Sequence, residues 1–374
     1  MYRIDYSFCP RLWSVVLLLT AIGLMLFATL VHAAPPIEEI RAIMAQKALQ
    51  PPSSALLAAL NDNHLNEGLI EIDPYARYVP PSTSSENSSS SLQLGIEVFA
   101  YKSRLWVRPD TGGPAYKAGM PEIANLRAIN NKKVNGVDLA KVSLLIDKAV
   151  RENRVVLTVF SLSTNKEKTY KVKPAAFKPP SITWRRIGTD FVIHIREFVA
   201  HDTAIGLSAI YTTLIRPGTR VVMDLRGCSG GDLYESLAIA GKYVSADLPL
   251  ASTYDRTGMV EPYRAPPGQK LPSPVFLLID NRTASAAEIL AGILQHYHFA
   301  LLIGERSFGK CVSQTLVPLS NGGGLWFTNL GIYFPDNQSC TGNGLQSDIS
   351  YPDIGITKMT DIMRKIDNTI SSPH

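Results

Sequence analysis

Residues 275–292 read VFLLIDNRTASAAEILAG and predict a strand, a polar turn and a helix in direct succession. The run from Val275 to Ile279 is wholly apolar, which is typical of a strand buried on both faces. Ser285 then stands at the start of the helix. A hydroxyl there has free backbone N–H groups and the positive end of the helix dipole beside it. Both would stabilise the oxyanion that forms when a serine attacks a carbonyl group.

The same residues also have a purely structural interpretation. Ser285 and Glu288 are three positions apart, the spacing of a helix capping box, in which each side chain accepts a hydrogen bond from the other residue's backbone. The turn by itself therefore does not separate a nucleophile from a cap.

A second polar turn follows the helix and one further strand. Residues 304–311 read GERSFGKC and place Lys310 where the next strand begins. A solvated lysine is protonated at neutral pH and cannot act as a base. Lys310 would need burial that lowers its pKa, and apolar neighbours such as Phe308 could supply it.

The two turns together resemble the signature of the carboxyl-terminal processing, or tail-specific, serine proteases of peptidase family S41. In that family a SASE-like turn with a serine precedes a TFGKG-like turn with a lysine, and a glutamine follows. Ser285, Lys310 and Gln314 match these residues, at separations of 25 and four positions. The resemblance implies that Ser285 is the nucleophile, Lys310 the general base and Gln314 the residue that positions the lysine amine. A neutral glutamine would orient the amine without keeping it protonated, as Glu288 would.

A glycine-rich loop upstream extends the resemblance. Residues 220–231 read RVVMDLRGCSGG and resemble the family's strand followed by a DLRGNPGG loop. The resemblance implies an oxyanion hole made by the N–H group of Gly230 or Gly231 together with that of Ala286. From the residues alone, the glycines indicate a strand-to-helix turn with positive φ angles. The loop lacks the GK[ST] ending of a phosphate-binding loop.

The cysteines depart from the family's pattern. Cys228 stands where asparagine is usual, and Cys311 follows the lysine where glycine is usual. We hypothesise a disulfide between these two, the alternative being two small buried side chains. With Cys340 they show no CxxC spacing, so we expect no metal ligands, and nothing in the chain implies a cofactor.

Three stretches before the core resemble a PDZ domain: residues 94–98, 113–120 and 126–134. The resemblance implies that a substrate tail adds as an extra strand, while N–H groups around Leu94, Gly95 and Ile96 hold its terminal carboxylate. Periodicity alone indicates only a small β-rich domain. Residues 72–79, IDPYARYV, resemble the segment that leads into this domain in the family.

The N-terminal sequence predicts an export leader. Arg3 and Arg11 precede an apolar run at 12–31, and Ala33 with Ala34 would suit signal peptidase. A run of this length would also serve as an anchor in the inner membrane. Either outcome exports the remaining chain to the periplasm or cell envelope, because the positive charges come first.

Composition favours a globular protein. Of the 374 residues, 45% are hydrophobic and 18% charged, and the net charge of +5 is spread along the chain without a basic block. Nucleic acid is therefore not expected as a partner. The resemblance implies protein or peptide substrates with free C-termini, and the N-terminal helices could form a homodimer contact.

The expected fold is an α/β catalytic core of crotonase/ClpP-like β-α units, with an inserted β-rich PDZ domain and N-terminal helices. Strands at 187–195, 220–225, 275–280, 300–303 and 312–317 alternate with helices at 201–215, 233–244 and 286–296. We expect five segments: 1–34 as leader or anchor, 35–91 as helices with a Ser-rich linker, 92–177 as the PDZ-like domain, 178–355 as the catalytic core and 356–374 as a C-terminal helix or tail.

Two other interpretations compete. A Ser-His-Asp hydrolase would draw on His194, His201, His296 or His298, but no GxSxG elbow accompanies them. A catalytically inactive PDZ scaffold would use the core only to bind peptides. The family spacing of serine, lysine and glutamine favours the protease.

Overall fold

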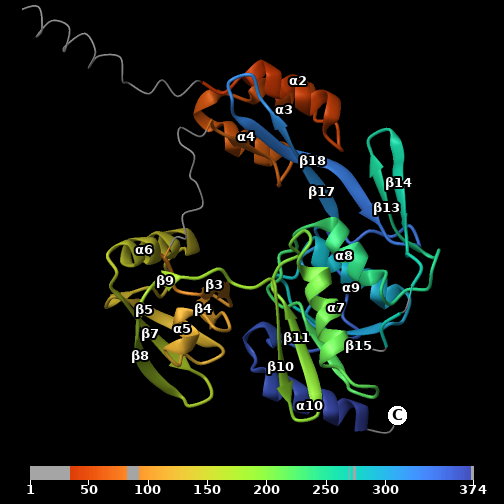
Figure 1. Cartoon of the computed structure of the whole chain (residues 1–374). Coiled ribbons are helices and arrows are strands. Elements are labelled where there is room, and N and C mark those ends of the chain that lie inside the picture. Colours follow the sequence, from red (N-terminus) through yellow and green to blue (C-terminus); the bar gives the residue numbers. More distant parts are fainter. Residues whose placement is uncertain (1–33, 82–91, 269, 273–274, 372–374) are drawn as a thin grey trace, which may run out of the picture. The chain divides into compact units, whose positions relative to one another are not determined.

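The computed structural model describes residues 34–81, 92–268, 270–272 and 275–371 (Figure 1). The expected leader or anchor, and the Ser-rich stretch from residue 82, lie outside these ranges. Among the helices of the described residues, none has the length and apolarity needed to cross a membrane. The chain divides into two units, of which the first joins the N-terminal helices to residues 315–327.

The first unit contains N-terminal helices, as expected for residues 35–91. Helix α2 (Ile37–Lys47) ends before Pro51 and Pro52, which cannot continue a helix, and α3 (Ser54–Ala59) begins after them. Strand β1 (Arg77–Val79) pairs antiparallel with the first residues of β18 (Gly324–Tyr333). The unit is completed by η1 (Asp62–His64), α4 (Leu65–Ile72) and the end of β17 (Val312–Pro318). Its apolar core combines both parts of the sequence and includes Ile40, Met44, Leu69, Leu325 and Phe327.

The second unit opens with a β-rich module, as the short apolar runs predicted. Its sheet has the order β3-β4-β5-β7-β8, so β3 lies at one edge. Helix α6 packs its apolar face on this sheet, and its N-terminus is capped by Asp138, which accepts a 2.8 Å bond from Ala140 N–H. The elements are β2 (Leu92–Gln93), β3 (Ile96–Tyr101), β4 (Arg104–Pro109), α5 (Pro114–Lys117), β5 (Ala124–Ile129), β6 (Lys132–Lys133), α6 (Leu139–Arg151), β7 (Val155–Ser161), β8 (Lys166–Val172) and β9 (Ala175–Ala176).

The core is built on a six-stranded sheet of order β10-β11-β12-β15-β16-β19. Strands β11 to β19 in this order are parallel, and β10 joins the edge antiparallel. The strands are β10 (Ile182–Ile187), β11 (Asp190–Ile195), β12 (Val221–Asp224), β15 (Val275–Ile279), β16 (Ala300–Gly304) and β19 (Ile349–Ser350). The α/β core expected from the sequence is confirmed.

Helices cover both faces of this sheet, because side chains alternate along each strand. Residues such as Ile193, Met223 and Leu277 pack with α7, α8 and α9, whereas Val192 and Val222 pack with α10. The bounds are α7 (Thr203–Thr213), α8 (Leu233–Ala240), α9 (Ala286–His296), η2 (Ile354–Ile356) and α10 (Met359–Ser371). The parallel strands β11, β12, β15 and β16 end toward one edge of the sheet, where the polar turns of the sequence follow them.

One strand prediction differs from the structure, and one hairpin was not predicted. Residues 187–195, expected as one strand, belong to the β10–β11 hairpin, because Gly188 turns the chain with a φ of 61°. The hairpin of β13 (Pro249–Asp255) and β14 (Gly258–Arg264) was not expected, since β14 is almost entirely exposed and has no apolar pattern to reveal it.

Candidate active site

The turn between β15 and α9 holds Ser285 in a strained conformation. Ser285 has φ 57° and ψ −125°, a region that costs an L-residue about 1–3 kcal/mol. The buried side chain of Thr283 braces the turn: its hydroxyl donates to Leu225 C=O at 3.0 Å and accepts from Asp280 N–H at 2.9 Å. The sharp strand-to-helix turn therefore fixes the serine at the N-terminus of α9.

Glu288 joins this turn to the turn that carries Lys310. The fully buried carboxylate accepts a hydrogen bond from Ser285 N–H at 3.0 Å, so the predicted cap is formed in this direction. The same oxygen, Oε2, accepts from Lys310 N–H at 2.7 Å. The other oxygen accepts from Ser307 Oγ at 2.5 Å and from Gly309 N–H at 2.7 Å. Four donors satisfy the buried charge and hold both turns on one side chain.

The glycine loop after β12 packs directly against the serine. A Cβ atom on Gly230 would lie 2.7 Å from Ser285 Cβ and 3.0 Å from Ala286 N. Gly230 also has a φ of 107°, and Gly231 one of 133° with no room for a Cβ beside Phe198 C=O. Only glycine allows this approach. The predicted oxyanion residues and the predicted nucleophile are thus brought together.

The N–H groups of this loop have different surroundings. Gly230 N–H donates toward the Cys228 thiol. No backbone hydrogen bond from Gly231 N–H or Ala286 N–H to another described residue is present. Burial raises the pKa of the Cys228 thiol to about 12, which keeps it protonated and unreactive at neutral pH.

The hypothesis of a disulfide between Cys228 and Cys311 is wrong. Cys311 pairs with Cys340, and Cys228 is a buried free thiol in the part of the chain that the structure describes. The loop carrying Cys228 is instead held by a backbone hydrogen bond of 2.9 Å from Ala284 N–H to Cys228 C=O. Cys311, Cys340 and Glu288 place potential metal-binding atoms within 4.8 Å of one another, but disulfide sulfurs are not thiolate ligands.

The surroundings of Lys310 differ from the expectation in one respect. Phe308, proposed to bury the lysine, is 55% exposed, because its neighbours Ser307 and Gly309 are the residues whose polar groups turn inward to Glu288. Phe308 N–H donates to Thr283 C=O at 3.0 Å, which adds a second link between the two turns. Lys310 itself is half-buried.

Gln314 lies on β17 and is also half-buried. Its Nε2 atom is buried and makes no hydrogen bond within the described ranges. A buried amide donor without a partner is unusual in a folded protein, and it indicates a position where a hydrogen-bond acceptor would bind.

The predicted carboxylate-binding residues lie at the start of β3. Leu94 is buried in the module's apolar core, and Gly95 has a φ of 62°. Their carbonyl groups are used inside the module, since Leu94 C=O accepts from Ala115 N–H and Gly95 C=O from Asp110 N–H, both at 2.9 Å.

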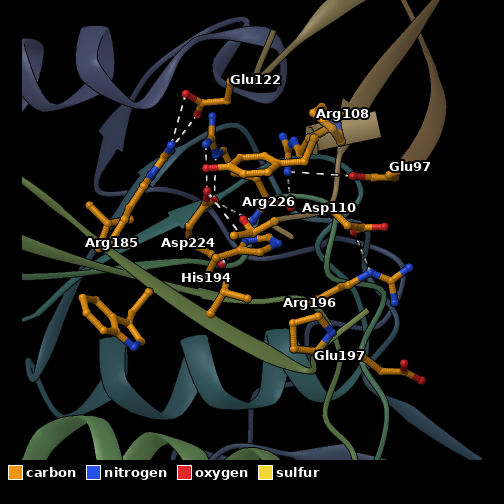
Figure 2. A pocket seen from close by; sticks show the side chains of 18 of the residues that line it. Glu97, Arg108, Asp110, Glu122, Arg185, His194, Arg196, Glu197, Asp224 and Arg226 are labelled. Carbon is orange, nitrogen blue, oxygen red and sulfur yellow. Dashed lines mark hydrogen bonds and ion pairs between the residues drawn. The ribbon is translucent and has the colours of Figure 1, made fainter. Parts of the chain in front are cut away.

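A cavity of about 490 Å³ adjoins the glycine loop (Figure 2). Its wall includes Gly227 and Ser229, and most of its other lining side chains are charged. Most of these charges pair with one another, as in Arg185–Glu122 at 2.7 Å and Arg196–Asp110 at 3.2 Å. The charged and histidine side chains that line the cavity are Glu97, Arg108, Asp110, Glu122, Arg185, His194, Arg196, Glu197, Asp224 and Arg226.

An ion pair at the end of β12, between Asp224 and Arg226, directly precedes the glycine loop. Arg226 donates Nε and Nη2 to Asp224, each at 2.7 Å, and Nη1 to Ile354 C=O at 2.6 Å. Burial alone would raise the pKa of Asp224, but the charge and hydrogen bonds of Arg226 outweigh it and hold that pKa well below its usual range. The carboxylate therefore stays ionised.

None of the four histidines considered for a Ser-His-Asp site bonds to Ser285 among the described residues. His194 lies in the cavity wall with Nδ1 3.2 Å from Asp224 C=O. Burial lowers the pKa of His194. His296 lies 3.8 Å from Asp336, His201 bonds through its backbone to Glu235, and His298 is exposed.

Sequence patterns did not reveal all the residues that hold the site. Glu288 was considered as a local cap and as a less suitable partner of the lysine amine than Gln314, and Ser307 and Asp280 were not singled out. Asp280 accepts from Gly227 N–H at 2.9 Å and so ties the glycine loop to the serine turn. A carboxylate directly after a buried strand was the available signal, because parallel strands end at one edge of the sheet.

Comparison with known proteins identifies the fold and the family. Residues 191–351 match the model of peptidase family S41. The photosystem II D1 C-terminal processing protease has a similar fold, with a TM-score of 0.60 at 21% identity, over 84% of this chain and 92% of that one. A candidate S41 protease of Bacteroides fragilis also gives a TM-score of 0.60, at 16% identity, over 89% of this chain and 98% of that one.

Curated relatives are more similar in sequence. A carboxyl-terminal-processing protease of Picosynechococcus is 30% identical over 273 residues, which cover 68% of this chain and 64% of the relative. The carboxy-terminal processing protease CtpB of Bacillus subtilis is 27% identical over 301 residues, or 76% of this chain and 62% of the relative. The chain thus spans somewhat under two thirds of the length of these two relatives.

The match of residues 191–351 places the α/β core of the chain in peptidase family S41. Beyond that core, the chain is similar to curated carboxyl-terminal processing proteases.

Proposed function

We propose that the chain is a serine endopeptidase that hydrolyses peptide bonds with Ser285 and Lys310. The observation that carries this proposal is the shared carboxylate oxygen of Glu288, which accepts from Ser285 N–H at 3.0 Å and from Lys310 N–H at 2.7 Å. A nucleophile and its base must be held at a fixed separation, and a common buried acceptor does this.

The mechanism follows from the groups around Ser285. Lys310, as a neutral amine, takes the hydroxyl proton while Ser285 Oγ attacks the substrate carbonyl carbon. Collapse of the tetrahedral intermediate breaks the C–N bond, Lys310 gives its proton to the leaving amine of the C-terminal fragment, and the acyl-enzyme remains. Lys310 then takes a proton from water, which attacks the ester, and returns it to Ser285 Oγ as the acid product leaves. Gln314 is assigned the role of positioning the amine; its buried Nε2, which has no hydrogen-bond partner among the described residues, is consistent with a polar group to be oriented there.

The oxyanion is assigned to the N–H groups of Ala286 and the glycine loop. Gly230 brings the loop against Ser285, but its own N–H is directed to the Cys228 sulfur. Gly231 N–H and Ala286 N–H have no backbone partner among the described residues, which favours this pair over Gly230. Preorganised amide donors of this kind typically contribute about 3–4 kcal/mol to transition-state binding.

The β-rich module is assigned the capture of substrate tails, as a PDZ domain. Strand β3 ends the module's sheet, so one edge has no partner strand within the described residues. An extended peptide with a free C-terminus would pair with this edge, and the N–H groups around Leu94, Gly95 and Ile96 would hold its carboxylate. The substrates are therefore proteins or peptides with an accessible tail.

Export is part of the proposal. The leader at residues 1–34 supports placement in the periplasm or cell envelope, either free after cleavage or tethered by residues 12–31.

The test uses the full-length chain and an unfolded protein with a free, apolar C-terminus. Wild type should release fragments, and Ser285→Ala and Lys310→Ala should each lower kcat/KM by about 10³-fold or more. Tail binding by both variants would exclude misfolding as the cause. Cleavage that survives Ser285→Ala would overturn the proposal.

The inactive scaffold is the second candidate, and the same experiment separates it. A scaffold would bind the tail in wild type without cutting it. The strained φ of Ser285 argues for the enzyme, because a cap has no need of a conformation that costs free energy.

A further inference from the structure

Residues 340–346 lie along the whole lysine turn. Before Lys310, Ser307 exchanges two hydrogen bonds with Leu345, Ser307 N–H donating to Leu345 C=O at 3.1 Å and Leu345 N–H to Ser307 Oγ at 2.6 Å. Gly342 N–H donates to Gly309 C=O at 2.9 Å. After Lys310, Thr341 Oγ1 donates to Cys311 C=O at 3.1 Å. The backbone on both sides of Lys310 is thus held by one segment.

The close packing leaves little room for rearrangement between the two segments. A Cβ on Gly344 would lie 2.2 Å from Ser307 C=O, and one on Gly309 would lie 2.9 Å from Gly344 N. Both glycines also have positive φ angles, 68° and 95°. Glycine at both positions is therefore required for the lysine turn and residues 340–346 to approach each other this closely.

The Cys311–Cys340 disulfide closes this contact covalently. It joins residues 29 positions apart, with Cα atoms 5.3 Å from each other, and both side chains are buried. The family pattern described above has glycine after the lysine, so the cross-link is a feature of this chain and not of the motif. Its sulfur atoms also lie close to the Glu288 carboxylate that binds Lys310 N–H.

We propose that the Cys311–Cys340 disulfide is a positioning element for catalysis, which holds the half-buried Lys310 in a fixed place relative to the Ser285 turn. The inference rests on the proposed function, in which Lys310 is the base. Without the cross-link, residues 340–346 keep their packing and hydrogen bonds but lose the covalent tie to the lysine turn, so water can compete for those hydrogen bonds. Water reaching the amine would favour its charged form, so a smaller fraction of Lys310 would be neutral at pH 7.

The proposal predicts a particular kinetic signature. Opening the disulfide should lower kcat at neutral pH by about 10-fold to 100-fold, since small misplacements of a catalytic group have costs of this size. KM should change by no more than about twofold, because tail binding does not involve the lysine turn. The acidic limb of the kcat/KM profile should move to higher pH, so that activity returns in part in alkali.

Reduction and mutation open the bond in independent ways. A dithiol such as dithiothreitol attacks one sulfur as a thiolate, forms a mixed disulfide and closes into its own disulfide, leaving Cys311 and Cys340 as thiols. The double variant Cys311→Ser/Cys340→Ser lacks the bond from the start and retains Cys228. It should resemble reduced wild type and should not respond to the dithiol, whereas oxidised wild type should respond.

The experiment measures kcat, KM and the pH profile of full-length oxidised wild type, reduced wild type and the double variant. Mass spectrometry counts the thiols, and near-ultraviolet circular dichroism checks the fold. If the double variant does not fold, the reduced wild type carries the test.

The proposal is overturned if the acidic limb of the pH profile stays in place when the disulfide is opened. This holds if kcat is unchanged, and it also holds if kcat falls, because a fall without a shift of the limb is a structural effect. Ser285→Ala in the oxidised form keeps the two proposals apart: if it remains active, the proposed function fails. If it is inactive while the opened forms keep the wild-type profile, only the positioning role fails.

Discussion

Position 230 has no space for a side chain. Adding a single methyl group there therefore tests whether the glycine loop contributes to catalysis. An alanine there would place Cβ 2.7 Å from Ser285 Cβ and 2.9 Å from Ala284 C=O. The loop would have to retreat from the serine, and the amide donors would move with it. We expect Gly230→Ala to lower kcat/KM by about 100-fold or more, measured on the same tailed substrate.

Gly218→Ala is the matched control. Gly218 has a φ of 82°, but a Cβ there would meet no atom within 4 Å. It therefore has the backbone cost of a positive φ, about 1 kcal/mol, without the clash. Thermal unfolding should show the backbone cost in both variants and a larger loss in Gly230→Ala, which adds the clash, while activity should fall only at position 230. Equal activities would mean that the loop does not contribute to the site.

At the scale of elements, helix α9 joins the two catalytic turns through one residue of its first turn. Glu288→Gln keeps the size of the side chain but replaces one accepting oxygen with an NH₂ group. That group would face N–H or O–H donors that now bind the carboxylate. We expect the free energy of unfolding to fall by about 1–3 kcal/mol and kcat to fall by about 10-fold to 100-fold. Urea denaturation and steady-state kinetics measure the two effects.

Glu235 offers a control within the same core. Its buried carboxylate on α8 also accepts from backbone N–H groups, those of His201 at 2.8 Å and Ala204 at 2.7 Å. Glu235→Gln should therefore cost a similar amount of stability but leave kcat near the wild-type value. If both variants lose kcat equally, Glu288 acts through general stability and not by positioning the turns.

At the scale of the whole molecule, the sequence predicted elements that are decided locally. Apolar runs of four or five residues located β12, β15 and β16, and helical periodicity located α7 and α9. Strands such as β14 and β18 were not predicted. Strand β14 has almost no buried residues. Strand β18 is shared between the two units, because its first part pairs with β1 and its last part with β13. Neither the exposure of β14 nor the double pairing of β18 produces a local sequence pattern.

The site divides in the same way. Local spacing picked out Ser285, Lys310 and the glycine loop, and the structure brings the serine and the loop into contact and links the serine turn to the lysine turn through Glu288. Partners distant in sequence were not predictable, because they depend on three-dimensional distance. Three cysteines allow three pairings, and the one chosen from the sequence, Cys228 with Cys311, was not the one formed. The direction of Phe308 was missed for the same reason.

Part of the dependence of stability on pH, that at about pH 6, should be traceable to His194. Burial lowers the pKa of this histidine below its value of about 6.5 in the unfolded chain. The groups that face it are Asp224, Arg108, Glu97 and Arg226, and the attraction of the two carboxylates does not overcome the burial. Between the two pKa values the unfolded chain binds more protons than the folded chain. His194 therefore costs no stability above about pH 6.5, and stability falls as the pH drops below that value toward the folded pKa.

His194→Gln should remove this part of the pH dependence. Urea denaturation at about pH 7.5, 6.5 and 5.5 should show wild type losing more stability toward acid than the variant does. Asp224 cannot be the source, because its pKa lies well below this window and it stays ionised in the folded state. The control is His298→Asn: His298 is exposed and has a φ of 57°, which asparagine tolerates, so its replacement should leave the slope unchanged. If His194→Gln leaves the wild-type slope intact, the buried histidine is not the group that couples folding to protons.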